Sequence, residues 1–244
     1  MAYTIEEELE FIESLYDDAN EQLSKVYEEQ KNNRDSLLSE IANIMLTYAI
    51  VDTIMDMSKK EKTIELARLT KIITKSSKVQ ATLTESVLNT ILTNTTKNTF
   101  NFYSYNAKLK DVQKIIDANF KGKHFSERIW DNETETAKHL HKQINDFLQG
   151  KINVNQIKKD LERTFNNSAY EVGRLAETEV SRVSNNAFDR FCIETNVKRV
   201  RYDATLDSKL CIDCAQYDNE IFDFDKKIEL PKHPKCRCHY SIVD

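Results

Sequence analysis

Glycine and proline are scarce in this 244-residue chain, and neither occurs in the first 121 residues. Because these residues interrupt helices, their scarcity predicts long helices. Apolar runs are also short, since the most apolar one, residues 44–51, falls far below the roughly 20 residues that cross a bilayer. The start carries Glu6, Glu7 and Glu8, where an export signal needs a basic segment and an apolar run. We therefore expect no membrane span and no export signal.

The cysteines of the chain do not follow the pattern of a disulfide-bonded protein, and its net charge is not positive. It has five cysteines, and four of them lie in the last 34 residues, whereas a secreted scaffold spreads an even number along a shorter chain. Reduced thiols in a cytoplasm fit this distribution better. The formal charge of −5 argues against a protein that coats nucleic acid over its whole surface.

The first half carries one apolar helical stripe with alternating spacings of four and three residues, as in coiled coils. Gln30 and Asn33 occupy two positions of this seam, which predicts a hinge, a turn or a register pin. Packing on the chain's own helices is the simpler interpretation, and a coiled coil with a partner is the alternative. The stripe consists of Leu9, Ile12, Tyr16, Ala19, Leu23 and Val26, followed by Leu37, Ile41, Ile44, Tyr48, Val51 and Met55.

Later helices are marked by their boundaries. Residues 78–107 are expected to be helical, and Gly122 marks the end of the next helical pattern. Gly150 closes a further helix, and two capping signals, Asn153 with Gln156 and Ser168 with Glu171, each predict a helix start.

The period changes to two after residue 196, which predicts short strands around Tyr202 and Tyr240. The expected fold class is therefore α+β, mainly α, with a small β-rich module resembling a zinc ribbon at the C-terminus. The expected parts are a long-helix region at 1–121, a helical part at 122–196 and a Cys/His module at 197–244.

The last module contains a pattern of metal-ligand type. Cys211 and Cys214 are two residues apart, and His233, Cys236 and Cys238 follow after eighteen residues. A two-residue gap lets two thiolates bind one ion, and a second group completes the tetrahedron that Zn²⁺ prefers. Four of these five residues are therefore the predicted ligands of a structural zinc ion.

The choice among the five stays open. Cys211, Cys214, His233 and Cys236 are favoured, because Cys236 and Cys238 on an extended chain would point to opposite faces. Cys238 in place of His233 is the main alternative, and a reduced cysteine cluster without metal is the third interpretation.

Four segments occur in order: Gly122–Trp130, Arg174–Arg182, Asp207–Cys214 and His233–Cys238. Together they resemble the C-terminal domain of the phage Mu F-like head morphogenesis family, over about residues 122–243. Glu177 departs from the arginine that is typical of that family at this position.

This resemblance implies a structural minor capsid protein of a tailed phage or prophage, which acts in procapsid assembly at the portal vertex or the head interior. It implies no catalysis. The expected location is the virion, and the host cytoplasm during assembly. Implied partners are the portal protein and the major capsid or scaffolding protein, with packaged viral DNA and self-association as further candidates.

Two other functions compete with this interpretation. A zinc-ribbon nucleic-acid binder would use basic residues near the module, such as Arg201, Lys232, Lys235 and Arg237. A metal-dependent nuclease is less favoured, because His233 is a ligand candidate and no second histidine is placed as a base. Glu177 and Glu179 lie two residues apart on an expected helix and cannot face one substrate.

Overall fold

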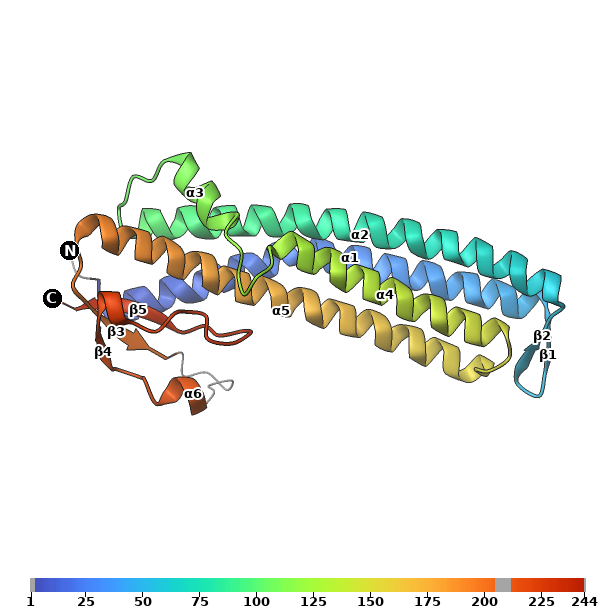
Figure 1. Cartoon of the computed structure of the whole chain (residues 1–244). Helices are drawn as coiled ribbons and strands as arrows, with labels where there is room; N and C mark the ends of the chain where they lie inside the picture. The colour runs from blue at the N-terminus through green and yellow to red at the C-terminus, as the bar shows by residue number, and fades with distance from the viewer. Residues whose placement is uncertain (1–2, 205–211, 244) are drawn as a thin grey trace. The chain divides into compact units, whose positions relative to one another are not determined.

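The computed structural model describes residues 3–204 and 212–243, so Cys211 lies outside the described residues. The fold is mainly helical with a small antiparallel sheet, which confirms the expected class. In chain order (Figure 1) the elements are α1 Ile5–Thr47, β1 Ala49–Val51, β2 Ile54–Asp56, α2 Lys59–Phe102, α3 Leu109–Ile116, α4 Phe125–Leu148, α5 Val154–Thr195, β3 Arg199–Asp203, α6 Ile212–Ala215, β4 Ile221–Asp223, the 3₁₀ turn η1 Phe224–Lys226 and β5 His239–Val243.

Helix starts follow from capping residues. Before α2, the Ser58 backbone N–H donates to Glu61 Oε2 (2.7 Å), and the Glu61 N–H donates to Ser58 Oγ (3.3 Å). Asn153 Oδ1 accepts hydrogen bonds from the backbone N–H groups of Asn155 (3.0 Å) and Gln156 (2.9 Å), which confirms the expected start of α5 there. The expected start at Ser168 is wrong, because α5 continues unbroken from Val154 to Thr195.

Helix α1 is continuous through Gln30 and Asn33, which excludes a hinge or a turn there. The helical stripe was expected to reach Met55, but α1 ends at Thr47 and the chain forms the β1–β2 hairpin. Positive φ angles at Asp52 and Thr53 turn the hairpin, and the apolar β-branched residues on either side favour strands.

The chain forms two compact units. Unit 2 comprises residues 24–86 and 126–172, and segments of α1, α2, α4 and α5 lie side by side in it (Figure 1). Its core joins residues from all four helices and from the hairpin: Leu37, Ile41, Ile44, Met55, Met57, Leu69, Ile73, Leu140, Ile144, Phe147, Leu148, Ile157 and Leu161.

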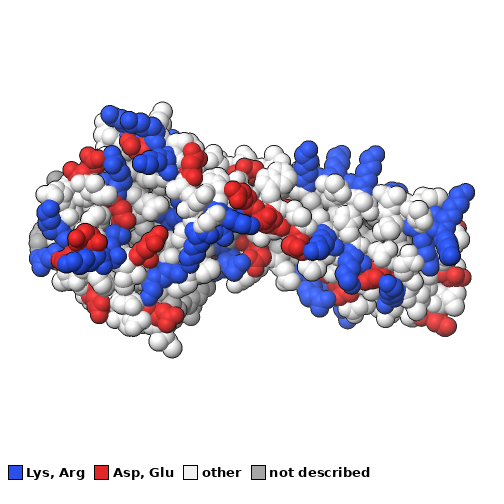
Figure 2. Space-filling view, viewed as in Figure 1, with Lys and Arg blue, Asp and Glu red and all other residues white. Residues whose placement is uncertain are grey.

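Unit 2 carries a basic surface along α2. Residues 59–78 contain seven Lys and Arg and two Glu. Both glutamates are engaged, Glu61 at the helix cap and Glu65 with Arg68 (2.7 Å). Lys71, Lys75 and Lys78 are exposed at spacings of four and three residues, so they lie on one helix face. Figure 2 shows lysine and arginine side chains along this part of α2 with no acidic side chain between them.

Unit 1 comprises residues 1–23, 87–125 and 173–244. Its sheet has the order β4-β3-β5, with all pairs antiparallel and Tyr202 opposite Tyr240. Helix α5 carries a buried ion pair in this unit, between Arg182 Nε and Glu179 Oε2 (2.6 Å). Arg182 also donates to the carbonyl oxygens of Ile115 and Ile116, which end α3 without helical partners.

Candidate metal centre

Three cysteine thiols of unit 1 meet in the interior. Cys214 lies on α6, and Cys236 and Cys238 lie in the irregular segment before β5. Their sulfur atoms lie within 4.8 Å of one another, and all three residues are buried, with at most 4% of their surface exposed. Three convergent thiols are soft ligands of the kind that binds zinc. Within the described residues, this cluster fits a metal ion.

The structure overturns the premise that Cys236 and Cys238 point apart. Both thiols belong to the cluster, because Cys236 and Cys238 lie in a segment that is not a strand, and β5 begins only at His239. His233 is also near: its Nε2 lies 3.2 Å from Cys214 Sγ, and its Nδ1 lies 2.9 Å from the Pro234 carbonyl oxygen. Cys211, the fifth candidate, lies outside the described residues, so the choice of ligands remains a prediction.

Helix α5 positions the segment that carries two of these thiols. The Lys235 backbone N–H donates to Thr178 Oγ1 (3.1 Å), and Asn185 Nδ2 donates to the Cys238 carbonyl oxygen (3.4 Å). Thr178 and Asn185 are both buried on α5. The cysteines are therefore anchored to a rigid element rather than carried on a free loop.

The electrostatics distinguish the Cys236 thiol of the cluster from the Cys192 thiol on α5. The pKa of Cys236 is lowered, chiefly by a hydrogen bond from the Cys238 side chain. Burial opposes this shift, and backbone hydrogen bonds add to it. A thiol that ionises more readily is a better metal ligand. Burial raises the pKa of Cys192 to about 12, so this residue is an inert part of the apolar core.

The sequence did not predict the two ion pairs that flank Cys236. Lys235 Nζ and Arg237 Nη2 lie 3.4 and 3.3 Å from the two carboxylate oxygens of Glu177. The Arg237 guanidinium also lies over the Tyr16 ring, 4.6 Å from its centroid. The alternation of basic residues with cysteines was visible in the sequence, but their partner on α5 was not.

The two glutamates of the Glu177–Glu179 segment serve different partners. Glu177 contacts Lys235 and Arg237, whereas Glu179 is buried against Arg182. The two carboxylates therefore do not converge on a common site.

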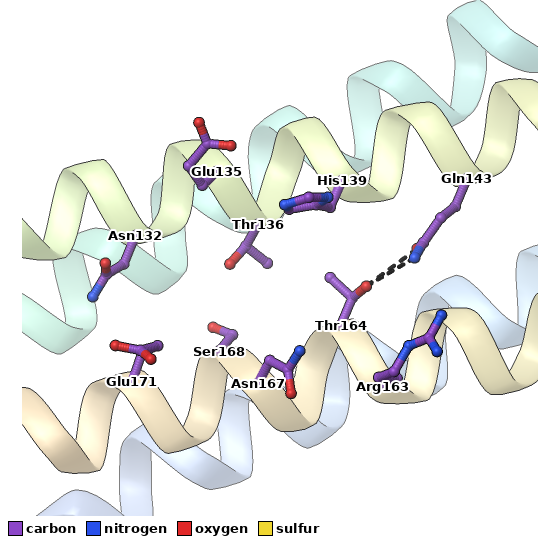
Figure 3. Close-up of a pocket in the computed structure, with 10 residues that line it drawn as sticks. All are labelled: Asn132, Glu135, Thr136, His139, Gln143, Arg163, Thr164, Asn167, Ser168 and Glu171. Atoms are coloured by element: carbon purple, nitrogen blue, oxygen red, sulfur yellow. Dashed lines mark hydrogen bonds between the residues drawn. The ribbon is translucent and has the colours of Figure 1, made fainter.

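Unit 2 contains a separate polar groove of about 390 Å³ between α4 and α5. Figure 3 shows Gln143 on α4 facing Thr164 on α5, with the Gln143 Nε2 to Thr164 Oγ1 hydrogen bond (3.0 Å) across the groove, and Asn132 facing Glu171 at its other end. His139 is exposed at this groove.

Comparison with known proteins gives one match. Residues 138–241 match a family model described as Phage Mu protein F like protein. This segment is similar to the Phage Mu protein F like family. The segment contains α5, the sheet and the cysteine cluster, and the match bears out the resemblance of the C-terminal sequence. The segment Gly122–Trp130 and the whole of α1 and α2 lie outside the match.

The match covers less than half of the chain. No curated protein and no solved structure matches the chain. Among the described residues, no helix has the length and apolar character needed to span a membrane.

Proposed function

We propose that the chain is a structural minor head protein of a tailed bacteriophage or prophage, which acts in procapsid assembly at the portal vertex or in the head interior. The match to the Phage Mu protein F like family carries this proposal. The partners are the portal protein and the major capsid or scaffolding protein, and the product of assembly is the virion.

The C-terminal module is proposed to hold one structural Zn²⁺. Its ligands are four of the residues Cys211, Cys214, His233, Cys236 and Cys238, and the clustering of the Cys214, Cys236 and Cys238 thiols supports these three as members of the set. Four protein ligands leave no position for a water nucleophile, so the ion supports the fold and catalyses no hydrolysis.

The N-terminal region, residues 1–121, is proposed as the adaptor to other head proteins. The exposed lysines of α2 support this role, because no ion pair within the described residues involves Lys71, Lys75 or Lys78. A basic helix face of this kind fits an acidic protein surface.

Incorporation into procapsids tests the proposal. Full-length protein supplied to phage lacking this gene should cosediment with procapsids. The variant K71E/K75E/K78E should be incorporated at least tenfold less. Its matched control is K138E/K142E/K151E, which makes the same charge change in unit 2 and breaks the ion pairs that these three exposed lysines form with Glu135 and Asp146. Absence of the wild-type protein from procapsids would contradict the assembly role, and equal incorporation of both triple variants would contradict the role of α2.

Nucleic-acid binding by the module is the second candidate, and its basic residues argue against it. Arg201 pairs with Asp203 (2.7 Å), Lys232 Nζ donates to the Asp213 carbonyl oxygen (2.8 Å), and Lys235 and Arg237 share Glu177. Side chains engaged in this way are poorly placed for phosphates. A salt-sensitive mobility shift of duplex DNA, lost in R201A/K232A, would favour this candidate.

A further inference from the structure

Unit 2 contains a buried polar layer to which its four helices each contribute one residue. Gln30 of α1, Gln80 of α2, Glu133 of α4 and Ser168 of α5 are each at most 5% exposed. They line a small cavity of about 10 Å³, which is close to the space that one water molecule needs. Gln30 is one of the two polar seam residues of the α1 stripe, and the second, Asn33, lines the same cavity.

Gln30, Ser168 and Glu133 form a hydrogen-bonded chain in which an oxygen atom at each end has no partner. Gln30 Nε2 donates to Ser168 Oγ (3.0 Å), and Ser168 in turn hydrogen-bonds to Glu133. On the other side, Asn33 Nδ2 donates to Gln80 Oε1 (3.1 Å). Within the described residues, Gln30 Oε1 and Glu133 Oε1 are buried without a hydrogen-bond partner. An amide oxygen and an ionised carboxylate can only accept, so what the layer lacks is a proton between them.

We propose that Glu133 is a buried proton-binding site, in which the neutral carboxyl group donates from Oε1 to Gln30 Oε1 across the cavity, directly or through one water molecule. A carboxylate at this position would be costly, because a buried charge without a partner is strongly disfavoured. The other residues that line the cavity, from α1, α2 and α5 as well as α4, carry no ionisable group. Burial raises the pKa of Glu133 to about 7, and the hydrogen bond from Ser168 opposes this shift.

The site is close to solvent through the groove of Figure 3. Thr136 and Ser168 line both the cavity and the groove, so protons have a short polar route to Glu133. The ionisable groups of the groove, Glu135, His139, Arg163 and Glu171, line the groove but not the cavity. Glu133 is therefore the group of this layer that responds to pH.

Proton binding makes the stability of unit 2 depend on pH. The pKa of Glu133 is raised on folding from 4.5 to about 7, so the folded state keeps a proton that the unfolded state has lost between these values. The stability that Glu133 contributes to the folded state is then fully present below pH 4.5 and is lost as the pH rises through 7. From this one group the unfolding equilibrium constant should increase roughly a hundredfold over that range.

The variant Glu133→Gln keeps the shape and a donor but cannot ionise. Urea unfolding of the full-length protein at pH 5 and pH 8 should show wild type losing stability relative to E133Q by roughly a hundredfold in the unfolding constant. The matched control is Glu135→Gln on the same helix, where the exposed carboxylate pairs with Lys138, and it should show no such change. A wild-type to E133Q difference that is the same at both pH values would overturn the proposal. Carboxyl ¹³C titration of native wild-type protein decides the matter even if E133Q does not fold: a Glu133 midpoint near 7 supports the site, and one near 4.5 excludes it.

Discussion

Cys238 and His233 compete for one ligand position, and the thiol cluster favours Cys238. The Cys238 sulfur lies with those of Cys214 and Cys236, whereas His233 has its contacts with the Cys214 sulfur and the Pro234 carbonyl oxygen. We predict that Cys238→Ala reduces bound zinc from about one ion per chain to less than about 0.3, and that His233→Ala retains it. Elemental analysis of protein purified without chelators measures the difference.

The control for this pair is Cys192→Ala, which alters a buried cysteine of the apolar core and should leave the zinc content unchanged. Cobalt substitution adds a second readout, because its thiolate absorption reports the number of sulfur ligands. Loss of zinc in His233→Ala with retention in Cys238→Ala would restore the ligand set that the sequence favoured. Wild-type protein without zinc would show that the cysteines pack without metal.

The candidate ligands were predictable because cysteine spacing is visible in a sequence. Their geometry was not, since the segment before β5 does not alternate like a strand and its two thiols both meet that of Cys214. The pairing of Glu177 with Lys235 and Arg237 joins residues about 60 positions apart, and local patterns carry no information about such contacts.

The β1–β2 hairpin fits against the end of α4 only because Gly150 has no side chain. Gly150 has a φ of +78°, and a Cβ atom there would lie 2.7 Å from Cγ2 of Ile54. We predict that Gly150→Ala lowers the free energy of unfolding by about 2–4 kcal/mol, from left-handed strain and overpacking together. Denaturant unfolding of the full-length protein measures this loss.

Gly122→Ala is the matched control, since Gly122 also has a positive φ (+83°) but has open space around its Cβ position. It should cost only the strain of the left-handed conformation, about 1 kcal/mol. Equal losses in the two variants would mean that the hairpin moves away from Gly150 at little cost.

At the scale of elements, capping residues and long helical periods predicted much of the fold. The start of α5 at Asn153 was predicted correctly, and the helix expected over residues 78–107 is present but ends at Phe102. Ser58 with Glu61 is a capping signal that could have marked the start of α2. The false start at Ser168 arose because a capping pair also occurs inside helices, where tertiary contacts decide its role. Ser168 is buried against Gln30, a contact between helices far apart in sequence.

The division of the whole chain at residues 121 and 196 remains a prediction. It can be tested because one apolar core contains residues from both sides of position 121. The buried residues Leu140, Ile144 and Phe147 of α4 pack in one cluster with Ile41 of α1 and Leu69 of α2. A fragment of residues 122–244 would expose this apolar face. We predict that it aggregates or loses cooperative unfolding, whereas the full-length protein stays soluble. Size-exclusion chromatography and circular dichroism measure both properties.

A soluble, cooperatively unfolding 122–244 fragment that still binds zinc would instead establish the boundary at Gly122. Addition of separately produced residues 1–121 provides the control for misfolding. If the two pieces form a soluble complex with the helicity of the intact chain, the aggregation reflects missing partners rather than a damaged fragment.

The discontinuous arrangement of the two units has a consequence for synthesis on the ribosome. Unit 2 is complete in sequence at Val172, but unit 1 still needs residues 173–244, whose synthesis takes roughly 4–14 s at bacterial elongation rates. During this interval the beginning of α1 and the end of α2 have been made, while the sheet and the second half of α5 that belong with them have not. Their apolar faces, including Leu15 and Phe100, are then open to chaperones and to neighbouring nascent chains. Translation speed over the last third of the gene should therefore influence how much of this protein reaches its folded form.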